Sequence, residues 1–284
     1  MTNILECLAA EYPQLYLNPD TEPQEIYRRV VLRGEEPERK NLDHYRGDPG
    51  DRDEMVDTPT GKVRVVTLGN RRDFELVMRS LLGAKTDPLK PIPESQGAAM
   101  VTVFNWPRIH AHLEQFPEEE RDAELKRFTS VKENYIDVLV VLSRGPYSHV
   151  DAATAGVGEA EWLDLSDVIR RNHELTHVIC RRKYPKDVAP IRDELVADAV
   201  GLYAAFGRFD PELERHFLGI REGKYEGGRL ANYTNQPEKI TESVCAALER
   251  IQAAIEANHG AQPFDLIPAL MAAADIGETQ ISQN

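Results

Sequence analysis

Cysteine is scarce in this chain, and the few cysteines form no recognisable pattern. Cys7, Cys180 and Cys245 are odd in number and far apart in the sequence. They therefore predict neither a disulfide framework nor a zinc site built from paired cysteines. We expect them to be small buried thiols.

Long apolar runs are missing as well. No stretch approaches the ~20 apolar residues that a membrane-spanning helix needs. The start of the chain also lacks the basic segment of a secretory signal. The sequence therefore predicts a soluble, cytoplasmic protein with no membrane partner, and it gives no indication of oligomeric state.

Basic residues are outnumbered by acidic ones. The chain has 34 Lys and Arg against 48 Asp and Glu, which gives a formal net charge of -14. Such a balance repels phosphate backbones, so we expect no nucleic-acid partner. A hydrophobic content of 41% in 284 residues is ordinary for a globular protein of one large or two modest domains.

Apolar patterning along the chain predicts an α+β protein. Short β-branched runs predict strands over residues 63–68, 98–104 and 136–142, and the last of these is the strongest. Apolar residues at helical spacing and helix-start signals predict the helices, which are expected over residues 72–82, 117–128, 164–182, 190–201, 241–255 and 266–274.

Side-chain chemistry predicts two helix caps and a surface loop. Ser166 or Asp164 is expected to cap the helix that ends near residue 182, and Thr241 is expected to cap the helix over residues 241–255. Residues 48–54 carry the turn formers and charges of a surface loop. We expect the first 60 residues to make few deep core contacts.

The pentad His173-Glu174-Leu175-Thr176-His177 is the feature with most chemical content. Residues four apart lie on one face of a helix, about 6 Å apart along its axis, so the two imidazoles can bind one metal ion. In proteins with this H-E-x-x-H pattern, the glutamate acts on the metal-bound water instead of binding the metal. Two histidines and a glutamate on a largely apolar helix would be costly to bury unless a cation satisfied them.

A catalytic zinc site normally has a third protein ligand and leaves one position for water. Cys180 shares the helix face of the histidines, but it lies about 10.5 Å along the axis from His173, too far for one tetrahedral ion. The extended metzincin pattern would require glycine at position 180 and histidine at position 183, where the chain has Cys180 and Lys183. That class is therefore excluded.

The helix that opens at Pro190 resembles the second ligand helix of the gluzincins, the thermolysin-like HExxH zinc metallopeptidases. In that family a glutamate binds zinc, an aspartate four residues later orients a ligand histidine, and a glycine often follows. Glu194, Asp198 and Gly201 match this register. The resemblance implies Zn²⁺ held by His173 and His177 together with Glu194.

An independent physical argument supports the same register. A metal-bound histidine needs an acceptor for its other ring nitrogen, and an acid one turn from the third ligand is well placed to supply it. Asp193 competes with Glu194 as the ligand, but the residue four positions after Asp193 is Ala197, which accepts no hydrogen bond from a side chain. Glu194 is therefore preferred.

The resemblance also implies a fold and a division of the chain. We expect a zincin-like α+β fold, in which a small β-sheet packs on the active-site helix. The expected parts are an N-terminal α+β region over residues 1–95, a catalytic core over residues 96–207, and a mainly helical C-terminal subdomain over residues 208–284.

The implied mechanism uses Glu174 as the catalytic base. Gluzincins stabilise the oxyanion with a tyrosine or histidine located after the ligand helices, so the candidates are Tyr233, His216 and Tyr225. Arg229 lies in a glycine-flanked segment and could assist or hold a substrate carboxylate. Tyr233 and His216 are predicted as catalytic residues.

Three further histidines are weaker candidates. His110 and His112 alternate as ligands on a strand would, but Trp106-Pro107-Arg108 indicates a helix start, which would point them apart. His149 follows the strongest strand and is expected in a surface loop. A structural or exposed role is expected for all three.

Three functions remain open from the sequence. The leading hypothesis is a zinc-dependent metallopeptidase acting on a peptide or protein substrate. The alternative is an inactive zinc-binding domain that serves as a binding or regulatory module, against which the intact Glu174 argues. The third is a structural protein without metal. Peptide as the substrate follows from the metal motif and not from a recognised substrate-binding sequence.

Overall fold

The chain divides into two compact units. The computed structural model describes residues 4–82, 91–94, 96–184 and 189–277. Unit 1 comprises Met1–Val56 and Val63–Ser143, and unit 2 comprises Asp57–Lys62 and Arg144–Asn284. The predicted boundaries after residues 95 and 207 fall inside unit 1 and unit 2, respectively. Helices and strands occur together, in a mixed architecture that is compatible with the α+β class.

Unit 1 contains most of the strands. A four-stranded sheet has the order β1-β2-β4-β3, in which β2 runs parallel to β4 and β3 runs antiparallel to β4. The strands are β1 (Arg52–Thr58), β2 (Gly61–Leu68), β3 (Ala98–Phe104) and β4 (Ile136–Ser143). The helices are α1 (Ile4–Glu11), α2 (Gln24–Tyr27), α3 (Arg71–Leu82), α4 (Trp106–Leu113) and α5 (Arg121–Thr129).

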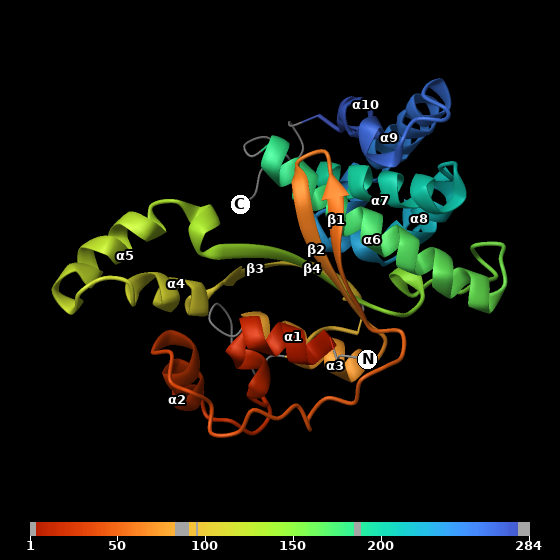
Figure 1. Cartoon of the computed structure of the whole chain (residues 1–284). Helices are drawn as coiled ribbons and strands as arrows, with labels where there is room; N and C mark the ends of the chain where they lie inside the picture. Colours follow the sequence, from red (N-terminus) through yellow and green to blue (C-terminus); the bar gives the residue numbers. More distant parts are fainter. Residues whose placement is uncertain (1–3, 83–90, 95, 185–188, 278–284) are drawn as a thin grey trace. The chain divides into compact units, whose positions relative to one another are not determined.

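All three predicted strands are confirmed. The prediction that the first 60 residues make few deep core contacts is wrong. The β1 strand begins at Arg52, inside the expected surface loop. Leu5 and Leu8 of α1 are fully buried and join one core with Phe74 and Met78 of α3. Both helices lie on the same side of β3 and β4 (Figure 1). Apolar residues spaced along a short N-terminal helix therefore supply part of the core, despite the charged residues between them.

Unit 2 is mainly helical. Its principal helices are α6 (Glu159–Lys183), α7 (Pro190–Phe206), α8 (Pro211–Leu218), α9 (Pro237–Ala257) and α10 (Ile267–Ala273). A short antiparallel pair, β5 (Ile220–Arg221) and β6 (Lys224–Tyr225), and a 3-10 turn over Arg229–Asn232 separate α8 from α9. A second 3-10 turn, Tyr147–His149, precedes α6.

The predicted helix caps in unit 2 are wrong. Helix α6 starts after Gly158, and its first turn carries Glu159 and Glu161, where carboxylates interact well with the helix dipole. Ser166 lies inside the helix, and its hydroxyl accepts a hydrogen bond from the backbone N–H of Tyr147 at 2.9 Å. Thr241 lies inside α9 and donates to the carbonyl of Pro237 at 2.8 Å. Neither hydroxyl therefore caps the free backbone N–H groups at the start of its helix.

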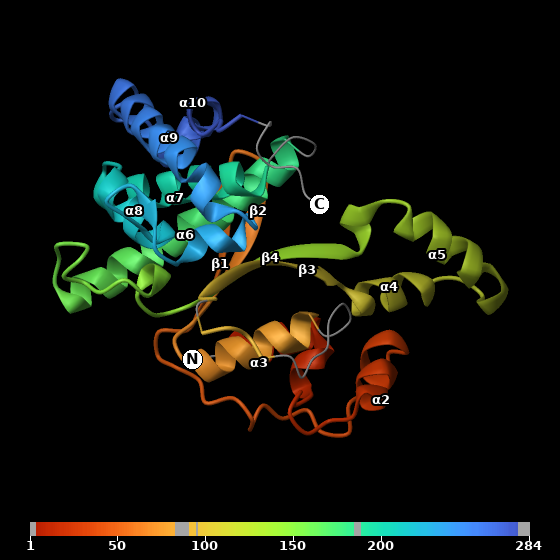
Figure 2. The same ribbon diagram turned by 180° about the vertical axis from the view of Figure 1, so that it is seen from behind.

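Helices α6 and α7 pack closely side by side (Figures 1 and 2). Gly201 of α7 faces the backbone of α6, because a Cβ atom added at this position would lie 2.8 Å from the carbonyl oxygen of Ile169. Real Cβ atoms do not approach so closely. The glycine predicted from the motif therefore permits the close helix contact on which the candidate site depends.

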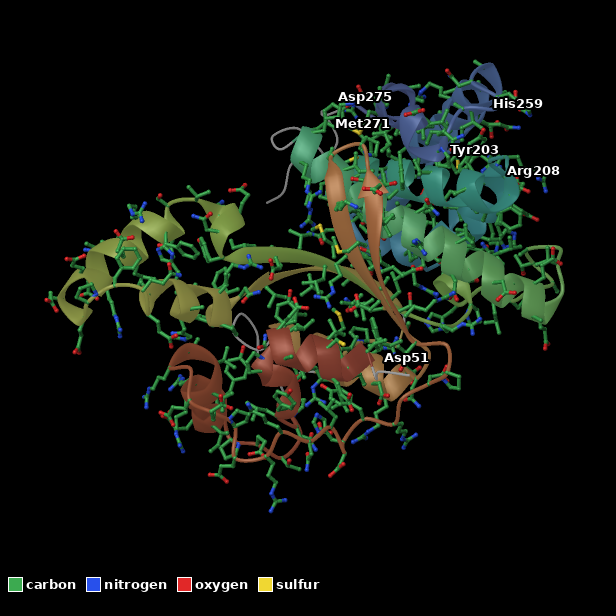
Figure 3. All side chains as sticks on the ribbon, viewed as in Figure 1. Asp51, Tyr203, Arg208, His259, Met271 and Asp275 are labelled. Atoms are coloured by element: carbon green, nitrogen blue, oxygen red, sulfur yellow. The ribbon has the colours of Figure 1, made fainter. Side chains whose placement is uncertain are left out.

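The remaining helices of unit 2 complete one hydrophobic core around α7. Buried Leu195 and Val200 of α7 join it with Leu248 of α9. Tyr203, labelled in Figure 3, connects α7 to the turn after α9: its hydroxyl donates to the carbonyl of Ala261 and accepts from the N–H of Gly260. Across the described residues of both units, no helix combines the length and the apolar character needed to cross a membrane.

Candidate metal centre

Helix α6 brings the two histidines of the pentad together. His173 and His177 lie one turn apart on the same face, and their Nε2 atoms are 2.9 Å apart. Both rings are largely buried, as is Glu174 between them in sequence. The helical spacing expected from the sequence is therefore realised, and the two imidazoles converge.

Helix α7 brings a carboxylate to the same point. One oxygen of Glu194 lies 3.5 Å from Nε2 of His173, and the other lies 3.5 Å from Nε2 of His177. Pro190 opens this helix at its first position, where the missing N–H has no consequence. The close approach at Gly201 then carries Glu194 to the histidine pair.

The opposite nitrogen of each ring is held by a second carboxylate from α7. Nδ1 of His173 lies 2.7 Å from Oδ1 of Asp198, and Nδ1 of His177 lies 2.7 Å from Oδ2 of Asp193. Because a carboxylate only accepts, each Nδ1 carries a proton, and a neutral ring in this tautomer has its lone pair on Nε2. Two nitrogen lone pairs and a carboxylate therefore point at a common space.

A positive charge between the two Nε2 atoms and the carboxylate of Glu194 would stabilise all three groups. Burial opposes protonation, but the hydrogen bond to Asp193 and the charges of Glu194 and Glu174 raise the pKa of His177 to about 9. A proton on His177 Nε2 shared with His173 would satisfy the pair, and a metal ion would satisfy it together with Glu194.

The donor geometry fits a metal ion. One ligand atom from each of His173, His177 and Glu194 lies within 4.8 Å of the others. Ligand atoms around a tetrahedral zinc ion are about 3.3 Å apart, given metal–ligand bonds of ~2.0–2.1 Å. The two Nε2 atoms are 2.9 Å apart, and each lies 3.5 Å from a different oxygen of Glu194, so these distances bracket that value. This group could therefore hold a metal ion with small adjustments of the side chains.

The local charge balance points in the same direction. Within the described residues, the carboxylates of Glu174, Asp193, Glu194 and Asp198 gather around the two rings. Arg229 brings a positive charge, with its guanidinium 3.6 Å from Glu194 and 2.6 Å from Asp198. An excess of buried negative charge is unfavourable, and a divalent cation would offset most of it.

Asp198 is the centre of a buried hydrogen-bond network. Besides His173, it accepts hydrogen bonds from the hydroxyl of Tyr147 at 2.5 Å and from Nη2 of Arg229 at 2.6 Å. Burial works against its charge, but Arg229, His173 and Tyr147 hold the pKa of Asp198 below its ordinary value. Burial and the charge of Asp198 raise the pKa of Tyr147, which therefore stays protonated and donates. Asp198 is thus an anion fixed from three directions.

Arg229 owes its position to two glycines in close contact. A Cβ atom at Gly228 would lie 2.7 Å from the Cα atom of Gly219, so the backbone before Arg229 approaches the end of α8 as only glycine allows. The guanidinium also donates to Oγ of Ser148 at 2.6 Å and, from Nε, to the hydroxyl of Tyr233 at 3.4 Å. The Gly-Gly segment noted in the sequence therefore makes a backbone contact that places Arg229 and, next to it, Tyr233.

Glu174 has a different environment from the other acids. It is 9% exposed and lies near enough to His177 to affect its pKa. In the part of the chain that the structure describes, its carboxylate has no hydrogen bond or ion pair. The carboxylate is therefore available to a water molecule or a substrate.

Several predicted candidates lie elsewhere. His216 of α8 interacts electrostatically with Asp151, and among the described residues it has no hydrogen bond or ion pair with the cluster. The hydroxyl of Tyr225 donates to the carbonyl of Gly228. Asp193, the alternative third ligand, is instead hydrogen-bonded to Nδ1 of His177. Burial, with the charge of Asp193, raises the pKa of the Cys180 thiol to about 12, so this residue remains a protonated buried thiol.

The three weaker histidine candidates belong to other elements. His110 and His112 lie on helix α4 of unit 1, as the helix-start signal predicted. His149 is exposed in the turn before α6 and has a positive φ of 57°. The surface position expected for His149 is therefore confirmed, and His110 and His112 lie on a helix instead of a strand.

Tyr147 and Glu214 of this region were not assigned from the sequence, and Arg229 was assigned to the oxyanion or a substrate carboxylate but not to Asp198, its partner in the structure. The strand end before Tyr147 and the glycine pair before Arg229 were visible signals of nearby loops, but neither specifies a partner. Glu214 carries no signal beyond its place on an amphipathic helix.

Comparison with known proteins places the chain in a family without giving a function. A model of the family of unknown function DUF7005 matches residues 3–263. No curated protein and no solved structure matches the chain.

Proposed function

The chain belongs to DUF7005, a family of unknown function, and we propose that it is a zinc-dependent metallopeptidase of the gluzincin type. The observation that carries the proposal is the convergence of His173, His177 and Glu194, with the carboxylate of Glu174 near His177 and without a hydrogen bond among the described residues. A zincin-like fold is part of this proposal.

The donor set favours zinc among the divalent ions. Two imidazole nitrogens and one carboxylate are the ligands of a known class of catalytic zinc site, whereas magnesium and calcium prefer oxygen donors. The carboxylates of Asp198 and Asp193 fix both rings in the tautomer that zinc needs. Three protein ligands leave a position for water or substrate.

The chemistry implied is hydrolysis by an activated water. When bound, zinc lowers the pKa of a coordinated water towards neutrality and polarises a carbonyl group. Glu174 would accept a proton from the attacking water and deliver it to the leaving amine, as a general base and then a general acid. Within the described parts of the chain the carboxylate of Glu174 has no competing hydrogen bond, which suits it to that role.

Tyr233 is the better candidate for stabilising the oxyanion. Its hydroxyl lies 3.4 Å from Nε of Arg229, and burial raises its pKa, so it remains a hydrogen-bond donor. His216, the other residue predicted for this role, has its electrostatic partner in Asp151. Arg229 is held by Asp198 and Ser148, and we assign it to positioning Tyr233 and Asp198.

The substitution Glu174→Gln tests the proposal. The variant should keep its zinc, because the three ligands are unchanged, and lose at least about a hundredfold in kcat for cleavage of a peptide library. Glu161→Gln, at an exposed position on the same helix, is the matched control and should cleave as the wild type does.

Two results would count against the proposal. Undiminished cleavage by the Glu174→Gln variant would show that another group is the base. A wild-type protein that binds zinc but cleaves no peptide would favour a binding or regulatory module.

A further inference from the structure

Glu214 is a buried acid that the proposed chemistry does not use. It lies on α8 and is completely buried. Neither carboxylate oxygen has a hydrogen-bond donor among the described residues. An ionised carboxylate in this situation would be strongly unfavourable, because burial removes its hydration and nothing replaces it.

The carboxylate of Asp198 lies within side-chain hydrogen-bonding reach of Glu214. Two ionised carboxylates in contact would repel each other, so one member of the pair must carry a proton. Asp198 already accepts from His173, Tyr147 and Arg229, which fixes it as the anion. The proton therefore belongs to Glu214.

The surroundings of Glu214 agree with this assignment. Burial and the charge of Asp198 raise the pKa of Glu214 well above its ordinary value, against the effect of Arg229. The charge of Glu194 acts in the same direction as that of Asp198. A neutral Glu214 also avoids adding one more negative charge to a cluster rich in carboxylates.

Asp198 lies between Glu214 and the ligand His173. Glu214 lies beside Asp198, and Asp198 is hydrogen-bonded to Nδ1 of His173, whose Nε2 faces His177 and Glu194. On the side of α8, Phe217 packs edge-on against Tyr147, another donor to Asp198, with ring centroids 5.2 Å apart. Helix α8 therefore contacts Asp198 and Tyr147, the residues that orient His173, through Glu214 and Phe217.

We propose that Glu214 is a positioning residue for the metal centre, which holds a proton and donates it in a hydrogen bond to Asp198, thereby fixing the ring of His173. This role rests on the metal binding in the proposed function, but it does not depend on peptide cleavage. The acid form supplies a donor in place of a further anion, so the amide of glutamine should substitute for it.

Infrared spectroscopy of the wild-type protein tests the protonation directly. In metal-free protein labelled with ¹³C at the glutamate side-chain carboxyls, a carbonyl band of a protonated carboxylic acid should persist at pH 8, where exposed glutamates are ionised. The band should be lost in Glu214→Gln and retained in Glu212→Gln, an exposed control on the same helix. Absence of the band from the wild type would overturn the proposal without any variant having to fold.

Zinc affinity tests the positioning role, with competition against a chelator as the measurement. Glu214→Gln should bind zinc within about threefold of the wild type, whereas Glu214→Ala should bind about tenfold more weakly, as expected when an outer partner of a ligand histidine is disturbed. Equal weakening in both variants would show that the negative charge is needed and would overturn the proposal, as would unchanged affinity in Glu214→Ala. Because no cleavage is measured, loss of the peptidase assignment alone would leave these results unaffected.

Discussion

Replacing Glu214 by glutamine should change how the stability of the protein depends on pH. In the unfolded chain this glutamate ionises at its ordinary pKa, near 4.3. In the folded protein burial and Asp198 raise its pKa well above that value. Above the unfolded pKa, folding must therefore take up a proton at Glu214, and the wild type loses stability as the pH rises towards the folded pKa. Glutamine has no such requirement.

The size of the effect follows from proton linkage. For one proton taken up on folding, the free energy of unfolding falls by about 1.4 kcal/mol for each pH unit over which Glu214 stays protonated. The groups that face Glu214, namely Asp198, Arg229, Glu194 and Tyr147, are the same in both proteins. Their contributions cancel to a first approximation, so the difference between the two proteins isolates Glu214.

Urea unfolding of metal-free protein between pH 5 and pH 7 is a suitable assay, because the buried Trp162 of unit 2 stacks on Phe217 of α8 and reports the loss of packing there. The advantage of Glu214→Gln over the wild type should grow with pH at about the rate given by linkage. Glu212→Gln should show no such trend. A constant difference between Glu214→Gln and the wild type across this range would refute the reasoning, because it would mean that Glu214 is ionised in the fold.

Two further predictions concern the residues that orient the histidines. Asp193→Ala should weaken zinc binding by about tenfold to a hundredfold, because Nδ1 of His177 loses its acceptor; an unchanged affinity in chelator competition would contradict this, and exposed Asp265→Ala is the control. Tyr147→Phe should keep its ring contacts but remove a donor to Asp198, and so weaken zinc binding by about 1 kcal/mol or more. Tyr203→Phe, which removes a buried hydroxyl of unit 2 outside the cluster (Figure 3), should leave zinc affinity unchanged, and equal losses in both variants would reject the role of Tyr147.

Helical periodicity explains why the sequence located the centre. The spacing of His173 and His177, and that of Glu194 and Asp198, are local properties of two helices, and a regular helix converts such spacing directly into a shared face. Glu194 and Asp198 could be separated by role because only one register gives both a ligand and an acceptor. Gly201 completes the pattern by letting the helices approach.

The supporting residues could not be found in the same way. Tyr147 and Asp198 are 51 positions apart, and Arg229 and Asp198 are 31 positions apart. Both pairs meet through loops whose course depends on tertiary packing, and no local period encodes it. The backbone contact between Gly219 and Gly228, which places Arg229, is likewise visible only in three dimensions.

The mistaken caps have a related cause. Serine and threonine hydroxyls cap helices well, but they also serve other partners, and Ser166 satisfies an amide in the turn of Tyr147. Helix α6 begins earlier, directly after Gly158, whose backbone is extended. The N-terminal residues were undervalued because their charges obscured the spacing of Leu5 and Leu8.

The zinc content of the protein, purified without added metal and measured by elemental mass spectrometry, tests the central claim most directly. We predict one equivalent of zinc per chain in the wild type and in His259→Ala, an exposed histidine beyond the end of α9 (Figure 3), and almost none in His173→Ala or Glu194→Ala. A wild-type protein that binds no zinc even after incubation with it, or a Glu194→Ala variant that keeps its full equivalent with unchanged affinity, would contradict the proposal that α6 and α7 share a single ion.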